Sequence, residues 1–181
     1  MEKKKSPQFE RTDKAIMYAM IRLLSDHSFE SITIQDILDE TPVSKGTFYA
    51  HYADKYEVAE RMLEEYQRIE LNMRSEMKAK SRHEQLLVAQ KTSYRDTALL
   101  HALLKIHTDK VDLEKSIKEN YQKEYMEKAK KTDHMELKAL VYASAITAYQ
   151  TYFIHQSKDL DNAVNLLDDV MEDVYHYFKK S

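Results

Sequence analysis

Apolar residues recur at intervals of three and four positions along most of the chain, which is the spacing of one face of an α-helix. Between residues 13 and 26 they form a single stripe, and we expect a first amphipathic helix that begins near Asp13 and ends near Asp26. The stripe is made of Ala15, Ile16, Ala19, Met20, Leu23 and Leu24.

Three further helices are expected before residue 78. The first spans Thr33 to Glu40, and it ends there because Pro42 disfavours helical backbone at Thr41. A second short helix spans residues 44–51, and a long helix runs from residue 54 to about residue 77. The side chains that we expect these elements to bury are Ile34, Ile37, Leu38, Phe48 and Tyr52.

The rest of the chain has the pattern of larger helices with short polar joints, at residues 82–91, 94–107, 110–130, 134–156 and 160–179. Most expected helix starts share one sign: a residue with a side-chain oxygen stands three positions before an acidic residue, and such a pair satisfies free amides of the first turn. The pairs are Thr33 and Asp36, Asp54 and Glu57, Ser81 and Glu84, Ser93 and Asp96, Asp109 and Asp112, and Asp133 and Glu136. The sequence therefore predicts an all-α fold.

The stretch from Ala139 to Ser157 contains no Asp, Glu, Lys or Arg. A membrane-spanning helix needs about 20 predominantly apolar residues. Polar Ser, Thr, Gln and His side chains interrupt this run, so we favour a buried helix over a membrane span. Because the helix has two apolar sides, we expect one to face its own core and the other to face a second subunit, together with the helix at 160–179. Burial of both sides within one subunit is the alternative.

Composition excludes several classes of site. The chain of 181 residues has one glycine, two prolines and no cysteine. Glycine-rich phosphate loops and nucleophile elbows each need two or more glycines, and disulfides and thiolate metal sites need cysteine. A chain without cysteine suits a reducing compartment, and no apolar segment follows the basic residues after Met1, so we expect a cytoplasmic protein without a signal peptide.

Charge and catalytic motifs do not indicate an enzyme. The formal net charge is −3, from 28 basic and 31 acidic residues, so bulk charge does not indicate a nucleic-acid binder either. No Glu-x-x-His motif of a di-iron bundle and no His-Glu-x-x-His motif occurs, and we expect neither catalysis, cofactor nor metal. Metal sensing with ligands from several helices remains an alternative.

The two short helices, joined by a tight turn, form a helix-turn-helix unit, in which the second helix of the pair lies in the major groove of DNA. Gly46, the single glycine, falls inside that helix, where glycine costs about 1 kcal/mol relative to alanine. Close approach of the backbone to a partner is one reason to place it there.

The segment resembles the N-terminal domain of TetR-family transcriptional regulators. The resemblance covers about residues 12–65 and is carried by Ile34-Gln35-Asp36-Ile37 and by the run Pro42-Val43-Ser44-Lys45-Gly46-Thr47-Phe48-Tyr49-Ala50-His51-Tyr52-Ala53-Asp54-Lys55. Two positions depart from the family pattern: Pro42 stands where the turn usually has glycine, and Ser28 replaces the glycine that usually ends the first helix. Because proline cannot adopt positive φ, we expect a locally different turn.

The resemblance implies a role for each matching residue. Phosphate contacts are implied for Thr33, Tyr49, His51 and Lys55, and contacts with bases or adjacent phosphates for Ser44, Lys45 and Thr47, with Gly46 allowing close approach. Tyr49 and His51 as surface residues without a role are the alternative. Lys3, Lys4 and Lys5 form either an arm that adds salt-dependent affinity for DNA or a solvated tail.

The resemblance also implies a division of the chain into a DNA-binding domain at residues 1–55 and an effector-binding and dimerisation domain at residues 56–181. Such a protein is a homodimeric regulator, and we expect a repressor that a small molecule releases from its operator. An interaction module or coactivator with the same fold is the alternative. Candidate effector contacts are Tyr66, Met73, Tyr94, His101, Leu104, His107, Tyr121, Tyr125, Tyr142 and Tyr149.

Overall fold

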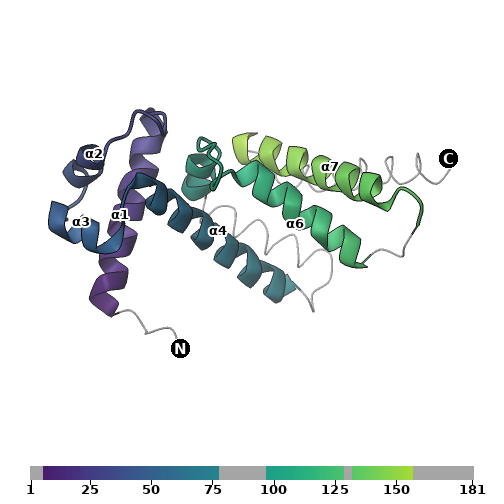
Figure 1. Cartoon of the computed structure of the whole chain (residues 1–181), viewed down its shortest axis with the longest axis horizontal. Coiled ribbons are helices and arrows are strands. Elements are labelled where there is room, and N and C mark those ends of the chain that lie inside the picture. Colours follow the sequence, from purple (N-terminus) through teal and green to yellow (C-terminus); the bar gives the residue numbers. More distant parts are fainter. Residues whose placement is uncertain (1–5, 78–96, 129–131, 157–181) are drawn as a thin grey trace. The chain divides into compact units, whose positions relative to one another are not determined.

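In a computed structural model of the chain, residues 6–77, 97–128 and 132–156 are described. They contain the helices α1 (Pro7–Asp26), α2 (Ile34–Asp39), α3 (Lys45–His51), α4 (Lys55–Met77), α6 (Leu113–Lys128) and α7 (Met135–Gln156), shown in Figure 1. Residues 97–103 are also helical. These ranges hold no strand, and the predicted all-α fold is confirmed.

Several predicted features lie outside the described residues. They are the helices at 82–91 and 160–179, the pair Ser81 and Glu84, the pair Ser93 and Asp96, the basic residues Lys3, Lys4 and Lys5, and Tyr94. The predicted helices at 94–107 and 110–130 are described in part, and within that part the helical residues are 97–103 and 113–128.

The first helix begins earlier than its apolar stripe indicated. Ser6 is the residue before α1, its hydroxyl accepts a hydrogen bond from the amide of Phe9 at 3.2 Å, and Pro7 occupies the first helical position. Proline is favoured there because its missing N–H is one that the helix leaves unpaired. The predicted start at Asp13 is therefore wrong, and Asp13 is instead a buried residue inside the helix.

The helix starts at Thr33 and Asp54 are confirmed, and the one at Asp109 is wrong. Thr33 and Asp36 form a complete capping box at the start of α2, and the amide of Glu57 donates to Asp54 Oδ1 at 3.0 Å at the start of α4. The residues after Asp109 instead form a turn, closed by reciprocal hydrogen bonds between Thr108 and Val111, so the next helix begins only at Leu113.

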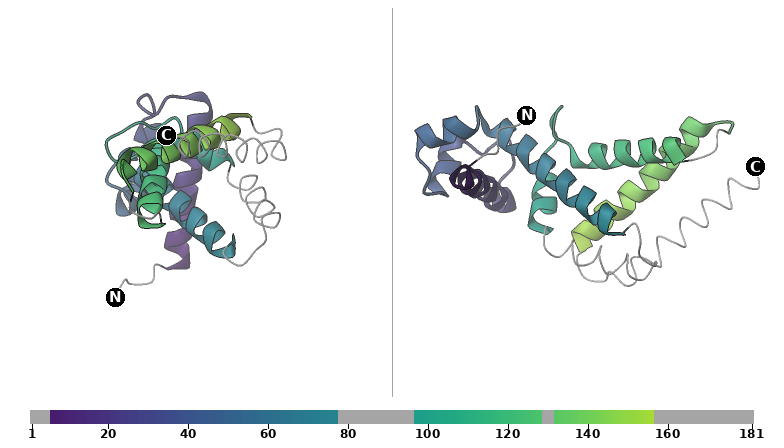
Figure 2. Two further views of the ribbon diagram at one scale, coloured as in Figure 1. Left: turned by 90° about the vertical axis from the view of Figure 1, so that its right-hand side faces the viewer. Right: turned by 90° about the horizontal axis from the view of Figure 1, so that it is seen from below.

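The helices α1 to α4 form one compact unit together with residues 96–112. In Figures 1 and 2, α2 and α3 lie on one side of α1, and α4 leads away from the other side. Four residues of the predicted stripe of α1, Ile16, Ala19, Met20 and Leu24, are buried in the core of this unit, whereas Ala15 and Leu23 are only partly buried. The most buried side chains of the unit are Ile16, Met20, Leu24, Phe29, Ile37, Phe48, Val58, Met62, Leu103 and Ile106.

Within the first unit, two lysines join residues 96–112 to α1 and α4. The ammonium of Lys105 donates to the carbonyl oxygens of Leu24 and Ser25 at 2.5 and 2.9 Å, at the C-terminal end of α1. Lys110 Nζ lies 2.8 Å from Glu60 Oε1 on α4. The packing of this unit thus extends beyond residue 55, where the predicted functional division falls, and that division stays a prediction.

The helices α6 and α7 belong to a second compact unit, in which they pack against each other and run antiparallel (Figures 1 and 2). Ile117, Ala139, Ala143 and Ile146 are buried there. On α7 the hydroxyl of Thr147 donates to the carbonyl oxygen of Ala143 at 2.8 Å, which lets a polar residue lie in an apolar setting. Among the described helices, none is long and apolar enough to cross a membrane.

Candidate nucleic-acid interface

The helix-turn-helix unit is built from α2, the turn that follows it and α3. Ser44 caps α3: its Oγ accepts a hydrogen bond from the amide of Thr47 at 3.2 Å and lies 2.8 Å from the Thr47 hydroxyl. The capping box at Thr33 likewise fixes the start of α2, and the hydrogen bonds that Asp36 accepts from the Thr33 amide and hydroxyl lower the pKa of its carboxyl. Both helix starts are therefore specified locally by the sequence.

The turn between α2 and α3 closes without a left-handed residue. No residue from 6 to 77 has a positive φ, as expected for a turn that contains Pro42. The amide of Thr41 donates to the carbonyl oxygen of Leu38 at 3.2 Å, and Arg22 on α1 donates to the carbonyl oxygen of Glu40 at 2.7 Å. An arginine from another helix thus satisfies a carbonyl at the end of α2.

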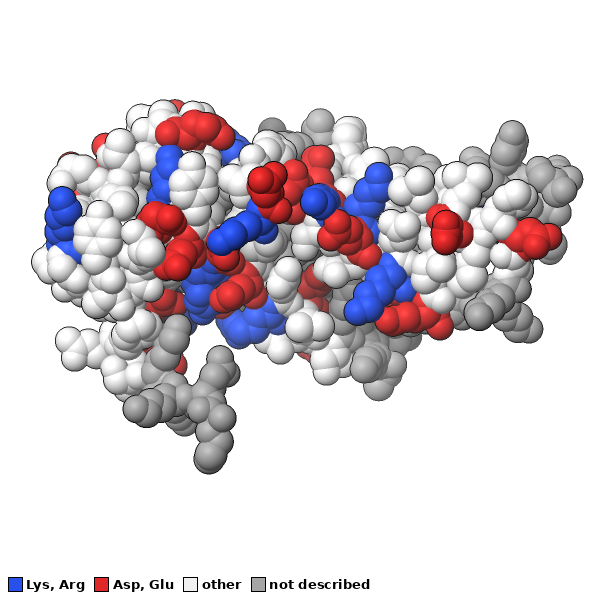
Figure 3. All heavy atoms as spheres, viewed as in Figure 1, with Lys and Arg blue, Asp and Glu red and all other residues white. Residues whose placement is uncertain are grey.

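The N-terminal half of α3 presents an exposed surface. Lys45, Gly46 and Thr47 are exposed, and Tyr49 is 49% exposed, whereas Phe48 is fully buried, as predicted. On the face drawn in Figure 3, the surface around α2 and α3 is mostly uncharged, with both basic and acidic atoms at its border, while acidic and basic side chains mix over α4. The exposed residues of α3 thus lie together, away from the mixed charges of α4.

Gly46 has no structural reason of its own to be glycine. Its φ is negative, as it is at any helical residue, and a Cβ placed on it meets no heavy atom within 4 Å. The fold therefore accepts alanine at this position, and alanine is the better helix former. Neither the backbone conformation nor the packing of the described residues requires glycine at this position.

His51 faces inward, contrary to the surface position that a phosphate contact requires. Its side chain is 5% exposed, and its ring stacks on Phe9 with a centroid distance of 3.8 Å and an interplanar angle of 20°. Its Nδ1 lies 3.9 Å from Asp13 Oδ1. The side chain packs α3 against α1 and is not part of the exposed surface of α3.

Lys55 is also engaged within the fold. Its ammonium donates to three carbonyl oxygens of the segment before α2, those of Phe29, Glu30 and Ile32, at 2.8, 2.9 and 2.8 Å. These bonds use all three hydrogens of the ammonium. The ammonium also lies 4.9 Å from the centroid of the Phe29 ring. Lys55 therefore holds the segment between α1 and α2 in place.

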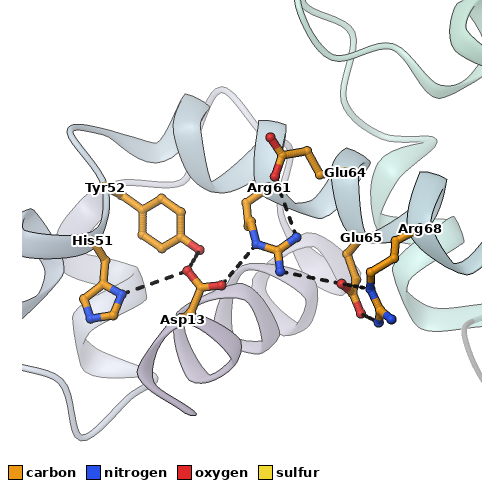
Figure 4. A network of polar contacts seen from close by, with 7 residues as sticks. All are labelled: Asp13, His51, Tyr52, Arg61, Glu64, Glu65 and Arg68. Atoms are coloured by element: carbon orange, nitrogen blue, oxygen red, sulfur yellow. Dashed lines mark hydrogen bonds and ion pairs between the residues drawn. The ribbon is translucent and has the colours of Figure 1, made fainter. Parts of the chain in front are cut away.

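A polar network joins α1, α3 and α4 around Asp13 (Figure 4). The hydroxyl of Tyr52, directly after α3, donates to Asp13 Oδ1 at 2.5 Å, and Nε of Arg61 on α4 donates to Asp13 Oδ2 at 3.1 Å. Burial, and after it the hydrogen bond to Asp13, raises the pKa of the Tyr52 hydroxyl, so the phenol keeps its proton. The carboxylate of Asp13 thus connects α3 to α4.

The network continues along α4 from Arg61 to Glu65 and Arg68. Nη2 of Arg61 lies 3.6 Å from Oε2 of Glu65, and Glu65 is also paired with Arg68. The hydrogen bond from Arg68 lowers the pKa of the Glu65 carboxyl, so Glu65 carries its negative charge at neutral pH.

Phe9 and Asp13 are not among the predicted site residues. Phe9 lies before the predicted first helix, and the predicted helix begins at Asp13. One signal was available: Asp13 lies three and four positions before the buried Ile16 and Met17, so it continues the apolar face of α1. A carboxylate on the apolar face of a helix needs partners, because an unpaired buried charge is costly.

The candidate effector contacts fall into different environments. Tyr142 on α7 lies beside two tyrosines of α6, with ring centroids 6.4 Å from Tyr121 and 5.2 Å from Tyr125. The amide of Gln150 donates to the Tyr121 hydroxyl at 2.9 Å. Among the other described candidates, Leu104 is buried and His107 is exposed, with its Nδ1 3.2 Å from Asp112 Oδ2. The remaining ones are partly buried: Tyr66, Met73, His101 and Tyr149. The structure brings the tyrosines Tyr121, Tyr125 and Tyr142 of α6 and α7 together.

No group of three or more His, Cys, Asp or Glu side chains suited to a metal ion occurs in the ranges that the structure describes.

Comparison with known proteins identifies the domain that holds this interface. Residues 16–62 match the family described as bacterial regulatory proteins, tetR family. The chain is also similar to YxbF of Bacillus subtilis (strain 168), named an uncharacterized HTH-type transcriptional regulator, with 30% identity over 56 residues. That similarity covers 31% of this chain and 15% of the relative. Over residues 16–62 the chain is therefore similar to the tetR family of bacterial regulatory proteins.

Proposed function

We propose that the chain is a DNA-binding transcriptional regulator that reads DNA with α3. The observation that carries this proposal is Gly46: it is the single glycine of the chain, it lies on the exposed side of a helix that does not need it, and its neighbours Lys45 and Thr47 are exposed polar residues. A glycine in such a place lets a partner approach the backbone closely. The match of residues 16–62 to the tetR family of bacterial regulatory proteins supports DNA as that partner.

Within this proposal the residues of α3 divide into two roles. The Thr47 side chain reaches base edges, as side chains at the start of a recognition helix do, and Lys45 and Tyr49 bind phosphates. Ser44 and Thr33 keep their capping bonds and add contacts to the DNA backbone. We leave His51 and Lys55 out of the contact set, because the burial of His51 and the three carbonyl bonds of Lys55 already employ these side chains.

The test is selection of binding sequences from a random pool of duplex DNA by the purified full chain, followed by gel-shift titration at several salt concentrations. We expect one enriched sequence with two half-sites about 34 Å apart, and an affinity that falls as salt rises. Tyr49→Phe should weaken binding to every sequence, whereas Thr47→Val should change the preferred sequence. Failure of the wild-type protein to enrich any sequence would refute the proposal.

We also propose that the regulator is a homodimeric repressor that a small molecule releases from DNA. Helix α7 supports the dimer, because it carries no charged side chain from Ala139 onward, two of its sides are apolar, and apolar residues such as Leu137 and Leu140 are exposed on it. The cluster of Tyr121, Tyr125 and Tyr142 supports an effector site, because aromatic side chains with a few polar groups are typical of ligand pockets.

Release from DNA follows from a population shift: an effector that binds the DNA-free conformation better lowers the share of the DNA-bound one. The long helix α4 supports this route, because Arg61 on α4 and Tyr52 after α3 bind the same carboxylate. Analytical ultracentrifugation tests the dimer, and a monomer at micromolar concentration would refute it. For the effector, a thermal-shift screen with aromatic and cationic compounds, repeated on Tyr142→Ala, should show stabilisation that the variant loses.

A further inference from the structure

We propose that Phe9 and Asp13, on the first turns of α1, are positioning residues that set the orientation of α3 for DNA. This inference rests on the proposed function and deepens it, because neither side chain belongs to the exposed surface of α3. Phe9 and Asp13 lie four positions apart, so they share one face of α1. That face meets His51 and Tyr52, two consecutive residues at the C-terminal end of α3.

Helix α3 is too short to hold an orientation by itself. It has seven residues, and an isolated helix of that length is not stable in water. Its direction relative to the rest of the unit therefore depends on tertiary contacts. Phe48 supplies an apolar contact in the middle of the helix, and the end of the helix is held by His51 and Tyr52.

The contacts at this end are directional. Apolar burial is roughly proportional to area and tolerates rotation, whereas a hydrogen bond weakens steeply away from its preferred angle. The Tyr52 hydroxyl donates to Oδ1 of Asp13, and Arg61 holds the other carboxylate oxygen, so the carboxylate cannot turn to follow a displaced tyrosine without losing α4 (Figure 4). The ring of Phe9 stacks on the ring of His51 at a centroid distance of 3.8 Å and so limits movement of His51.

A buried carboxylate is a costly way to hold two helices together, because well-packed apolar residues often stabilise as much. What the carboxylate adds is one defined geometry. The exposed residues of α3 lie one to two turns before Tyr52, so a small rotation about this end moves Lys45 and Thr47 by more than it moves Tyr52. DNA readout at the start of α3 therefore depends on the bonds at its end.

The experiment compares three single variants of the full chain. Tyr52→Phe removes the hydroxyl and keeps the ring, and Phe9→Leu removes the stacking partner and keeps an apolar side chain. Ile117→Val is the matched control, because it trims a buried side chain of α6, in the other unit, and lowers the melting temperature without touching α3. For each protein we measure the melting temperature, the Kd for the sequence selected by the wild type, and the Kd for a scrambled duplex of equal length.

We expect Tyr52→Phe to weaken binding to the selected sequence about tenfold, which is the size of one hydrogen bond to a charged group. Binding to the scrambled duplex should stay within about twofold, because phosphate contacts tolerate a reoriented helix. Ile117→Val should leave both Kd values unchanged below its melting temperature. If Tyr52→Phe does not fold, Phe9→Leu decides by the same criterion.

Two results would overturn the inference alone: unchanged affinity for the selected sequence in both Tyr52→Phe and Phe9→Leu, or an equal loss of affinity for the selected and the scrambled duplex. A wild-type protein that shows no preference among sequences would overturn the proposed function, and the inference with it. The wild-type arm therefore separates the two failures.

Discussion

Replacement of Gly46 by alanine should raise stability and lower DNA affinity, two effects of opposite sign from one methyl group. In the free protein the new Cβ meets no atom within 4 Å, and the backbone there is already helical. Alanine therefore adds no clash, and it reduces the conformational freedom that the unfolded chain loses on folding. On DNA the same methyl group occupies the space that the glycine leaves open.

The expected stabilisation follows from helix propensity. Glycine is about 0.8–1 kcal/mol less favourable than alanine in a helix interior, and position 46 is the second residue of α3, so the gain should be at most about 1 kcal/mol. For a chain of this size that corresponds to a rise in melting temperature of roughly 2–4 °C. The loss of DNA affinity should be tenfold or more, since about 1.4 kcal/mol of steric cost is enough for a factor of ten.

Differential scanning calorimetry and gel-shift titration of the same preparation check both effects. Asn72→Ala is the matched control, because Asn72 is an exposed residue of α4 and alanine raises helix propensity there too. The control should gain stability and bind DNA as the wild type does. Gly46→Ala with wild-type affinity would refute the close approach of DNA, and Gly46→Ala with a lower melting temperature would refute the open space around its Cβ.

Three further predictions concern polar contacts in the first unit. Lys55→Met should lower the free energy of unfolding by about 1–3 kcal/mol. In gel-shift titrations it should leave the slope of log affinity against log salt concentration unchanged. A slope smaller in magnitude by about 0.9 would mean that Lys55 binds a phosphate. Thr33→Ala removes the capping box of α2 and should cost about 1 kcal/mol in chemical denaturation, whereas Thr33→Ser should restore it. Arg68 lowers the pKa of Glu65 below its ordinary value of 4.5, so this pair stabilises the fold fully above about pH 4.5 and loses its effect as the pH falls through the lower folded-state pKa. Melting curves should therefore show a larger loss on acidification for the wild type than for Arg68→Met, and parallel curves would contradict this.

The sequence predicted what depends on neighbouring residues. The capping box of Thr33 and Asp36, the burial of Phe48 and the break at Pro42 all involve residues within a few positions of one another, and each is confirmed. The start of α1 at Ser6 has a local signal too, because Ser6 is a capping residue followed by proline. The apolar stripe begins later, however, and predicts a helix start near Asp13.

The sequence could not predict contacts with partners far along the chain. Lys55 binds carbonyl oxygens more than twenty positions away, and backbone carbonyls have no signature in a sequence. Asp13 and Tyr52 are 39 positions apart, so neither identifies the other. Resemblance to a family motif singles out His51 and Lys55 beside α3, but it does not distinguish a side chain that touches DNA from one that holds the helix in place.

The attachment of Lys105 to the end of α1 has a consequence for how the chain folds. The bonded atoms lie 80 and 81 positions apart, and Leu103 and Ile106 bury their side chains in the same unit. During synthesis, residues 1–75 therefore emerge before the segment that completes their core, and contacts of such long range slow folding. A fragment that ends at residue 75 would leave part of that core open to water. A shortened chain that keeps the helix-turn-helix unit in a complete core therefore has to include residues 96–112.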